Sequence, residues 1–293
     1  MRIGAFEVVE PLPQLREPHA VAMLRPWTDA GNVGALALLE LERQFSARPC
    51  ASLARPGSFY DFTRYRPTVY LRDGVRHLSV PNTVVSVATP PHGPHLIIIK
   101  MLEPHMFAET YVESILTLLG SLGVRRYLWV GSMYDMVPHT RPLLVSGGAV
   151  GTETEADASR LGIVPTRYQG PSTMTFEVIQ KAPLMGIESL WGIVHLPQYV
   201  QVEEDYAGKV RLMQLLQGLY DIEIDVSDVE RALEQTETMD SLAANNPDLA
   251  QVVSHFEARY EGRLQGKGER TPPLPPDVVQ FLNELGRRRN DAA

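Results

Sequence analysis

One short stretch, Tyr127 to Gly148 (YLWVGSMYDMVPHTRPLLVSGG), gathers a serine, an acid, a histidine and an arginine around a single loop. Ser132 followed by His139 could indicate a nucleophile with its base, as in serine hydrolases. The nucleophile elbow of those enzymes needs Gly-x-Ser-x-Gly on a strand-to-helix turn, and no second glycine follows Ser132 here. We therefore favour a strand that ends at Gly131 and a loop serine that bonds to its own backbone.

Arg141 offers a different chemistry. Pro142 follows it and holds it in an extended conformation, outside any helix. An extended arginine at the end of a strand could bind the carboxylate or phosphate of a ligand. It could also form a structural ion pair with Asp29 or Glu103. We expect the structural pair, because charges at the edge of a sheet usually need a partner.

A second candidate site lies where Asp29 to Asn32 (DAGN) precedes a predicted helix. Backbone N–H groups at such a start could receive an anion. Gly31 and Gly34 alone do not make a dinucleotide fingerprint, and no GxxxxGK[ST] loop follows them. We interpret Asp29 or Asn32 as a helix cap.

The sequence predicts no metal site and no cofactor. His92 and His95 lie in one loop, whereas His105 lies beyond a whole strand, about 20 Å or more away. These histidines are therefore not expected to bind one metal ion together with Glu103. The single cysteine, Cys50, can form neither an internal disulfide nor a cysteine-based zinc site.

The elements that must position these residues alternate between short apolar runs and amphipathic stretches from about residue 23 to residue 197. Residues 94–102 and 124–132 are typical of buried strands, and residues 32–45 and 105–123 have helical periodicity. This alternation predicts an α/β fold, a three-layer α/β/α sandwich with a mostly parallel sheet. Sites in such sheets form beyond the carboxyl ends of the strands, so we expect the strand-end loops to converge.

The predicted organisation is a core domain over residues 1–200, a helical subdomain over 201–264, and a linker with a terminal helix over 265–293. Three consecutive helical patterns fill the second part. Glycine, proline and charged residues dominate 265–277, and residues 278–289 (VVQFLNELGRRR) are typical of a last helix.

Charge and hydropathy exclude two classes of partner. The net charge is −8, and no basic cluster precedes Arg287–Arg289, so nucleic-acid binding is not expected. No apolar run approaches the roughly 20 residues of a membrane span. Charged residues also interrupt the N-terminus before a signal-peptide core could form. Together with the single cysteine, these features favour a cytoplasmic protein.

Several short motifs together resemble the proteasome assembly chaperone (PAC) family, in its broad prokaryotic branch and the bacterial type with a C-terminal helical extension. The resemblance covers about residues 20 to 240. It rests on the order and spacing of WTDAGNVGALAL, FYDFTRYRPTV, LEPHMF, VGSMYDMVPHTRP, YQGPSTM and LPQYV. It implies a sandwich similar to the nucleoside-phosphorylase-like fold with a small helical C-terminal region. It also implies homo-oligomers, with a trimer favoured, and chaperone or scaffold roles in archaeal and eukaryotic members.

The chain departs from the family at its C-terminus. Members that dock on a proteasome do so through a tail with a hydrophobic residue and a penultimate tyrosine, whereas this chain ends Asn290-Asp291-Ala292-Ala293. Docking by that route is not expected. Some relatives carry an ATP-grasp label, but no phosphate loop or pair of metal-binding acids supports it here.

Two hypotheses follow. The first is a non-catalytic, oligomeric assembly or interaction protein whose protein partner is unknown. The second is an enzyme or binder of a nucleoside- or phosphate-type small molecule that uses the strand-end cleft. In the second, acid–base work would fall to Glu103 or His139. Anion binding would fall to Arg66 or Arg141. The candidate cleft or contact residues are Asp29, Asn32, Arg66, Glu103, Ser132, His139 and Arg141.

Overall fold

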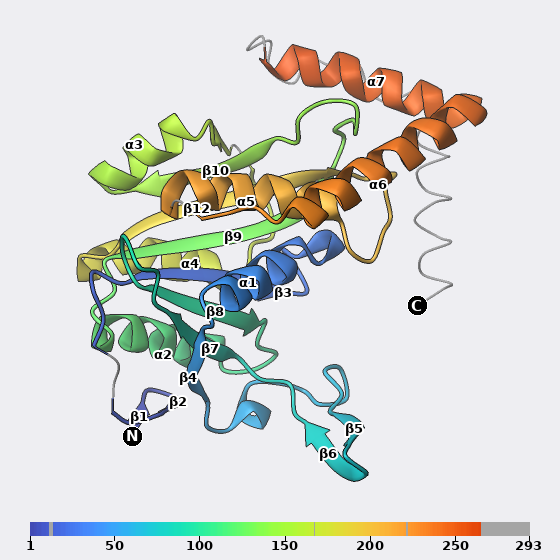
Figure 1. Ribbon diagram of the computed structural model, residues 1–293. Coiled ribbons are helices and arrows are strands. Elements are labelled where there is room, and N and C mark those ends of the chain that lie inside the picture. Colours follow the sequence, from blue (N-terminus) through green and yellow to red (C-terminus); the bar gives the residue numbers. More distant parts are fainter. Residues whose placement is uncertain (12–13, 167, 221, 265–293) are drawn as a thin grey trace. The chain divides into compact units, whose positions relative to one another are not determined.

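A computed structural model describes residues 1–11, 14–166, 168–220 and 222–264 of the chain. Its main element is a ten-stranded sheet with the order β1-β2-β4-β7-β8-β3-β9-β12-β10-β11 (Figure 1). A separate hairpin pairs β5 with β6. The strands are β1 (Arg2–Ile3), β2 (Phe6–Val8), β3 (His19–Arg25), β4 (Arg48–Leu53), β5 (Thr68–Arg72), β6 (Val75–Ser79), β7 (Val84–Ala88), β8 (Leu96–Leu102), β9 (Arg126–Asp135), β10 (Val145–Val150), β11 (Val164–Pro165) and β12 (Glu188–Pro197).

Helices occupy most of the connections, and three of them follow one another after the last strand. The α-helices are α1 (Val33–Gln44), α2 (Ala108–Ser121), α3 (Thr152–Arg160), α4 (Met174–Lys181), α5 (Tyr206–Tyr220), α6 (Val226–Asn245) and α7 (Pro247–Leu264). Short 3-10 turns lie at Ala30–Asn32, Pro56–Ser58 and Ala182–Met185.

The sheet is mixed. Strand β3 pairs in parallel with β8 and with β9. The other side of β8 continues through β7, β4, β2 and β1, and each of these pairs is antiparallel. The predicted α/β class is confirmed, whereas the antiparallel half departs from the mostly parallel arrangement that the alternation suggested.

The chain divides into two compact units. The first unit consists of Met1–Asp29, Gly34–Gly131 and Gly147–Gly192. The second consists of Ala30–Val33, Ser132–Ser146 and the chain from Ile193 onward. The division at residues 200 and 264 stays a prediction, and the linker and last helix expected over 265–293 lie outside the described residues.

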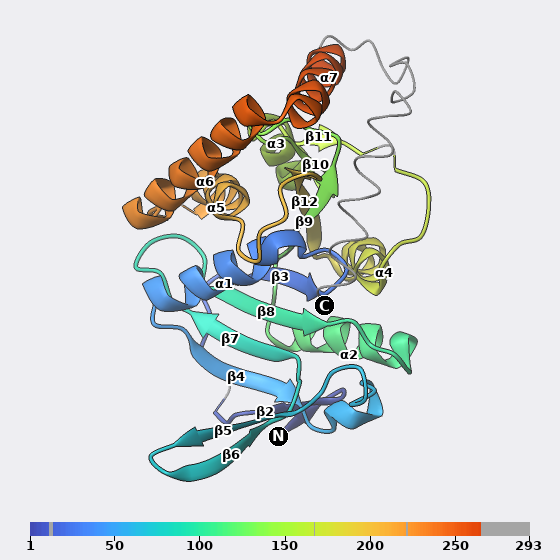
Figure 2. The same ribbon diagram turned by 90° about the vertical axis from the view of Figure 1, so that its right-hand side faces the viewer.

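The core of the first unit is built on strands that are apolar on both faces. Leu96 to Ile99 of β8 are fully buried, as the continuous β-branched run predicts. Figure 2 shows α1 and α2 on opposite sides of β3 and β8. Each helix presents an apolar stripe, such as Leu38 and Leu41 in α1, which are fully buried. Helices on both faces agree with the predicted layers.

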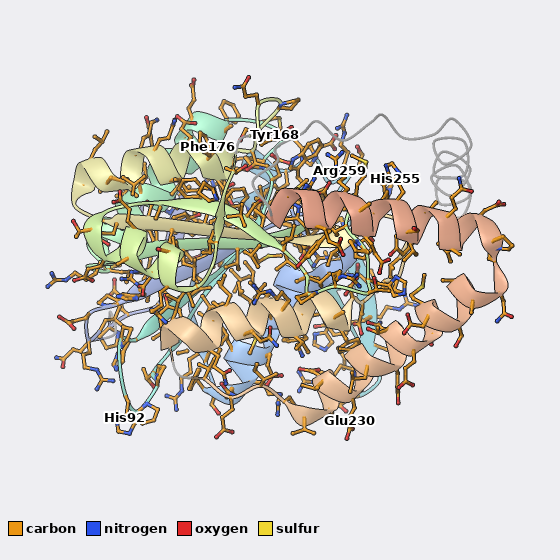
Figure 3. All side chains as sticks on the ribbon, turned by 90° about the horizontal axis from the view of Figure 1, so that it is seen from above. His92, Tyr168, Phe176, Glu230, His255 and Arg259 are labelled. Carbon is orange, nitrogen blue, oxygen red and sulfur yellow. The ribbon has the colours of Figure 1, made fainter. Side chains whose placement is uncertain are left out.

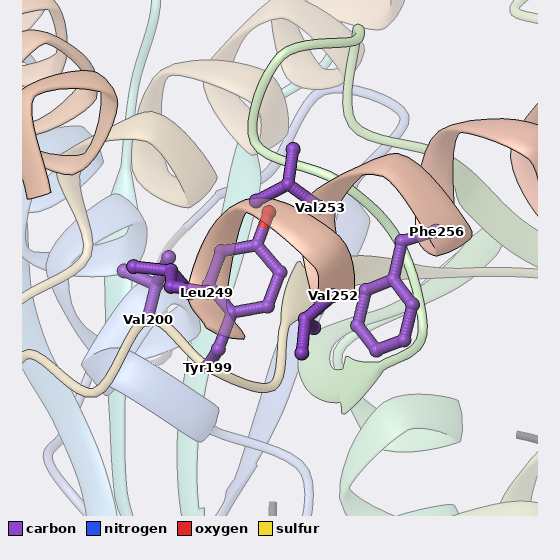
Figure 4. Close-up of a cluster of buried hydrophobic side chains, with 6 residues drawn as sticks. All are labelled: Tyr199, Val200, Leu249, Val252, Val253 and Phe256. Atoms are coloured by element: carbon purple, nitrogen blue, oxygen red, sulfur yellow. The ribbon is translucent and has the colours of Figure 1, made fainter. Parts of the chain in front are cut away.

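The second unit packs α5, α6 and α7 with the chain segments around β9 and β12. A buried ion pair between Lys209 Nζ and Asp228 Oδ2, 2.5 Å apart, joins α5 to the first turn of α6. Helix α7 contributes four buried side chains to an apolar cluster with Tyr199 and Val200, shown in Figure 4. In the described part of the chain, no helix is both long and apolar enough to span a membrane.

Candidate functional site

The loop between β9 and β10, residues 136–144, lies in the second unit and contacts all three C-terminal helices. His139 Nε2 lies 3.1 Å from Asp240 Oδ1 of α6. Arg141 pairs with α7, and the α7 residue Tyr260 donates a hydrogen bond of 2.9 Å to the carbonyl oxygen of Pro142. Arg211 Nε of α5 donates to the carbonyl oxygen of Leu143 at 2.8 Å. Neighbouring residues of this loop thus anchor all three helices.

Arg141 forms a structural ion pair, as expected, but with partners that the sequence did not indicate. Its guanidinium reaches Glu257 Oε1 at 2.9 Å and Glu261 Oε1 at 3.2 Å. The neighbouring Thr140 Oγ1 also donates to Glu257 Oε1, at 2.5 Å. These partners lie on α7, whereas the sequence offered Asp29 or Glu103.

His139 is held from both sides of its ring. Its backbone N–H donates to the Tyr199 hydroxyl at 2.9 Å, and its Nδ1 lies 2.7 Å from the same oxygen. Because the carboxylate of Asp240 can only accept, Nε2–H of the neutral ring donates to it, and Nδ1 then accepts from the Tyr199 hydroxyl. Burial raises the pKa of Tyr199, so the phenol stays protonated. Both ring nitrogens are engaged, which leaves His139 without a free lone pair for base catalysis.

Asp29 caps α1, as predicted. Its Oδ1 accepts from Gly34 N at 2.7 Å and from Ala35 N at 3.2 Å. Burial raises the pKa of Asp29 to about 6, although the two backbone hydrogen bonds and Arg25 oppose the shift. Arg25 Nε is 3.8 Å from the carboxylate. Asn32 does not cap the helix, because its side chain donates to the carbonyl oxygen of Glu203 at 2.9 Å.

The remaining candidates have three different surroundings. Ser132 is fully buried inside β9, which continues to Asp135, and it donates to the carbonyl oxygen of Ala30 at 2.7 Å. The expectation of a strand that ends at Gly131 and of a loop serine that bonds to its own backbone is therefore wrong, because the strand runs past both residues. Glu103 follows β8, and burial raises the pKa of its carboxyl group. Arg66 is exposed, two residues before β5.

The seven candidates divide between the units. Asp29, Arg66 and Glu103 belong to the first, and Asn32, Ser132, His139 and Arg141 to the second. Within the second unit each of the four bonds to a different partner. Their assignment as cleft or contact residues stays a prediction.

The structure also brings together a chain of polar groups that the sequence reasoning missed. Ser146 Oγ lies 2.6 Å from His195 Nε2, and His195 Nδ1 lies 2.7 Å from Asp135 Oδ2. Arg263 Nη1 of α7 donates to the same Asp135 oxygen at 2.7 Å. The only sequence signal was a lone histidine in the apolar strand 190–197, and sixty residues separate it from Asp135.

The Ser146–His195–Asp135 relay has the order of a serine-hydrolase triad. Nδ1–H of His195 donates to Asp135, and Nε2 of His195 faces Ser146. Burial alone would raise the pKa of Asp135, but the hydrogen bonds from His195 and Arg263 outweigh it and hold the pKa well below its ordinary value. Ser146 lies inside β10 rather than on a strand-to-helix turn. The arrangement ties three strand segments to α7.

Comparison with known proteins places these features in a family. A model described as the PAC2 family matches residues 23–243. The chain belongs to the PAC2 family. The match includes the 136–144 loop and α5, and this confirms the family resemblance drawn from the motifs.

Solved structures resemble this PAC2 family chain over most of its length. A PAC2 family protein from Streptomyces avermitilis is 28% identical, with a TM-score of 0.71 over 80% of this chain and 99% of that one. A proteasome-assembly chaperone homologue from Mycobacterium tuberculosis is 25% identical, with a TM-score of 0.70 over the same shares. A protein of unknown function from the same organism is 23% identical, with a TM-score of 0.77 over 97% of both chains, and it supports the fold alone. No curated protein matches the chain.

Proposed function

We propose that this PAC2 family chain is a non-catalytic assembly protein that acts through contact surfaces and forms homo-oligomers, with a trimer as the favoured state. The hairpin β5–β6 is the observation that carries the proposal. Every residue of both its strands is exposed. A two-stranded hairpin is marginally stable by itself in water, so covering it would stabilise it.

One face of this hairpin carries three apolar side chains and Arg76, the cross-strand partner of Leu71. Val69 pairs with Leu78 in register, and side chains alternate along a strand, so Leu71 lies on the same face. The exposed fractions are 63% for Val69, 70% for Leu71 and 61% for Leu78. Large apolar side chains exposed together are typical of a protein interface.

The charge of the hairpin suits a second copy of this chain. Arg72 and Arg76 outweigh Asp73 on the hairpin, while the whole chain carries a net charge of −8. The rest of any other copy is therefore net acidic, and complementary charges favour association.

The relatives support an assembly role. The Mycobacterium tuberculosis structure that is 25% identical is described as a proteasome-assembly chaperone homologue. A cytoplasmic location belongs to the same proposal.

Sedimentation velocity of the full chain at low micromolar concentration tests the proposal. The unmodified chain should sediment as an oligomer, and Leu71→Asp should shift it toward the monomer. Thr68→Asp is the matched control, because it adds the same charge on the opposite face of the same strand. A monomeric unmodified chain, or equal dissociation by both variants, would contradict the proposal.

A small-molecule function is the second candidate, and the Ser146–His195–Asp135 relay is the observation that favours it. Nucleosides, nucleotides and inorganic phosphate are the probes that the predicted cleft chemistry suggests. A ligand present at 100 times its Kd should stabilise the folded chain by about 2.7 kcal/mol. If none of these probes raises the melting temperature of the chain, the small-molecule function is contradicted and the assembly role is the proposal that remains.

A further inference from the structure

Helix α6 presents an apolar face beside a hollow of about 560 Å³ in the second unit. The 136–144 loop, α5 and α6 form its walls, with Leu143, Val210, Val229, Leu233 and Met239 among the apolar lining residues. A hollow of this size is large enough for several apolar side chains of a docked helix.

The apolar face continues out of the hollow along α6. Val226, Val229 and Leu233 follow one another at helical spacing and are 70%, 37% and 58% exposed. Exposed apolar side chains that recur at helical spacing are typical of a helix face that packs against another element.

An acidic stripe runs beside the apolar one. Glu230, Glu234 and Glu237 recur at the same spacing and are exposed. Glu230 lies at the outer side of α6 in Figure 3. The face therefore fits an amphipathic helix that carries apolar anchors and adjacent positive charge.

We propose that residues 278–289 of the same chain are the occupant of this face. Val278, Phe281, Leu282 and Leu285 have the i, i+3, i+4, i+7 spacing of the anchors of a helix in a groove. Arg287–Arg289 follow after Gly286, and their positive charge is opposite to that of the acidic stripe. The segment supplies both features that the face requires.

The last turns of α7 contact a residue that lines the hollow. In the last turns of α7, Tyr260 bonds to the carbonyl oxygen of Pro142, and Pro142 itself lines the hollow. The thirteen residues 265–277 that follow could span at most about 43 Å when extended. This reach allows the segment to return to α6 of its own chain.

Disulfide trapping in the full chain tests the proposal. In a Cys50→Ala background, Leu233→Cys and Phe281→Cys are introduced together and oxidised with glutathione disulfide. The expected product is an intrachain disulfide that forms at least about ten-fold faster than in the control pair, Thr238→Cys with Phe281→Cys. Thr238 lies roughly 180° around α6 from Val229.

Three results would overturn the proposal. Equal rates for the two pairs would show that the segment does not select the apolar face. A covalent dimer would assign the face to a second copy instead. Hydrogen exchange supplies the independent check: Phe281→Asp with Leu285→Asp should speed exchange over residues 226–239, and unchanged exchange there would also contradict the proposal.

Discussion

Phe256→Ala should release α7 from the second unit, whereas Arg141→Ala should leave it in place. Phe256 is fully buried in the cluster of Figure 4, with its ring centroid 5.6 Å from that of Tyr199. Truncating a buried phenylalanine to alanine costs about 3–5 kcal/mol, because both the transfer free energy and the packing around the ring are lost.

The ion pairs of Arg141 contribute much less. Its side chain is 37% exposed, and those of Glu257 and Glu261 are 29% and 56% exposed. Solvent screens such pairs, so each contributes about 0–1 kcal/mol. A difference of roughly 3 kcal/mol between the two variants corresponds to a factor of about 100 in an opening equilibrium.

Hydrogen exchange of α7, followed by mass spectrometry, measures this factor. Exchange over residues 249–263 should rise about 100-fold or more in Phe256→Ala and about 30-fold or less in Arg141→Ala, which loses both ion pairs. Ser254→Ala, at an exposed position of the same helix, is the control for the substitution itself. If Arg141→Ala opened α7 as far as Phe256→Ala, the ion pairs rather than the apolar cluster would hold the helix.

Three further outcomes are expected. Because the pKa of Asp29 is raised to about 6 in the folded chain, its contribution to stability is present below about pH 4 and is lost as the pH rises through 6. Asp29→Asn should therefore remove up to about 3 kcal/mol of pH dependence in urea unfolding between pH 4 and pH 8. The lowered pKa of Asp135 acts in the opposite sense, since its stabilisation is present above about pH 4 and lost on further acidification. Asp135→Asn should thus lower stability at pH 7 and flatten the acid limb of the unfolding curve. A fluorophosphonate probe should leave Ser146 unlabelled, and labelling that disappears in Ser146→Ala would contradict the non-catalytic role.

Local signals in the sequence were sufficient for the buried strands and the first helices. The run Leu96 to Ile99 is β-branched or apolar at every position, and α1 repeats its apolar residues at helical spacing. The antiparallel half of the sheet was harder to predict, because the partner of a strand is a non-local property. Strand β7 pairs with both β4 and β8, and nothing within Val84–Ala88 specifies those partners.

The candidate site could be predicted only in part, for the same reason. The role of Asp29 as a cap is decided by nearby residues, whereas Ser132 bonds to Ala30, 102 residues away. The partners of Arg141 lie on α7, more than a hundred residues away in the chain. His139 and Tyr199 are sixty residues apart. No spacing rule connects such positions, since only the folded chain brings them together.

The 136–144 loop looked like a reacting centre because anchoring helices and catalysing reactions use the same residue types. A loop that holds three helices must satisfy partly buried donors and acceptors, and histidine, threonine and arginine supply them. What separates the two roles is whether a lone pair or a proton remains available for a substrate. His139 gives both ring nitrogens to Tyr199 and Asp240, and Arg141 gives its guanidinium to α7. The groups with reactive chemistry in this loop are thus already committed to the fold, and this favours a contact surface over a catalytic one.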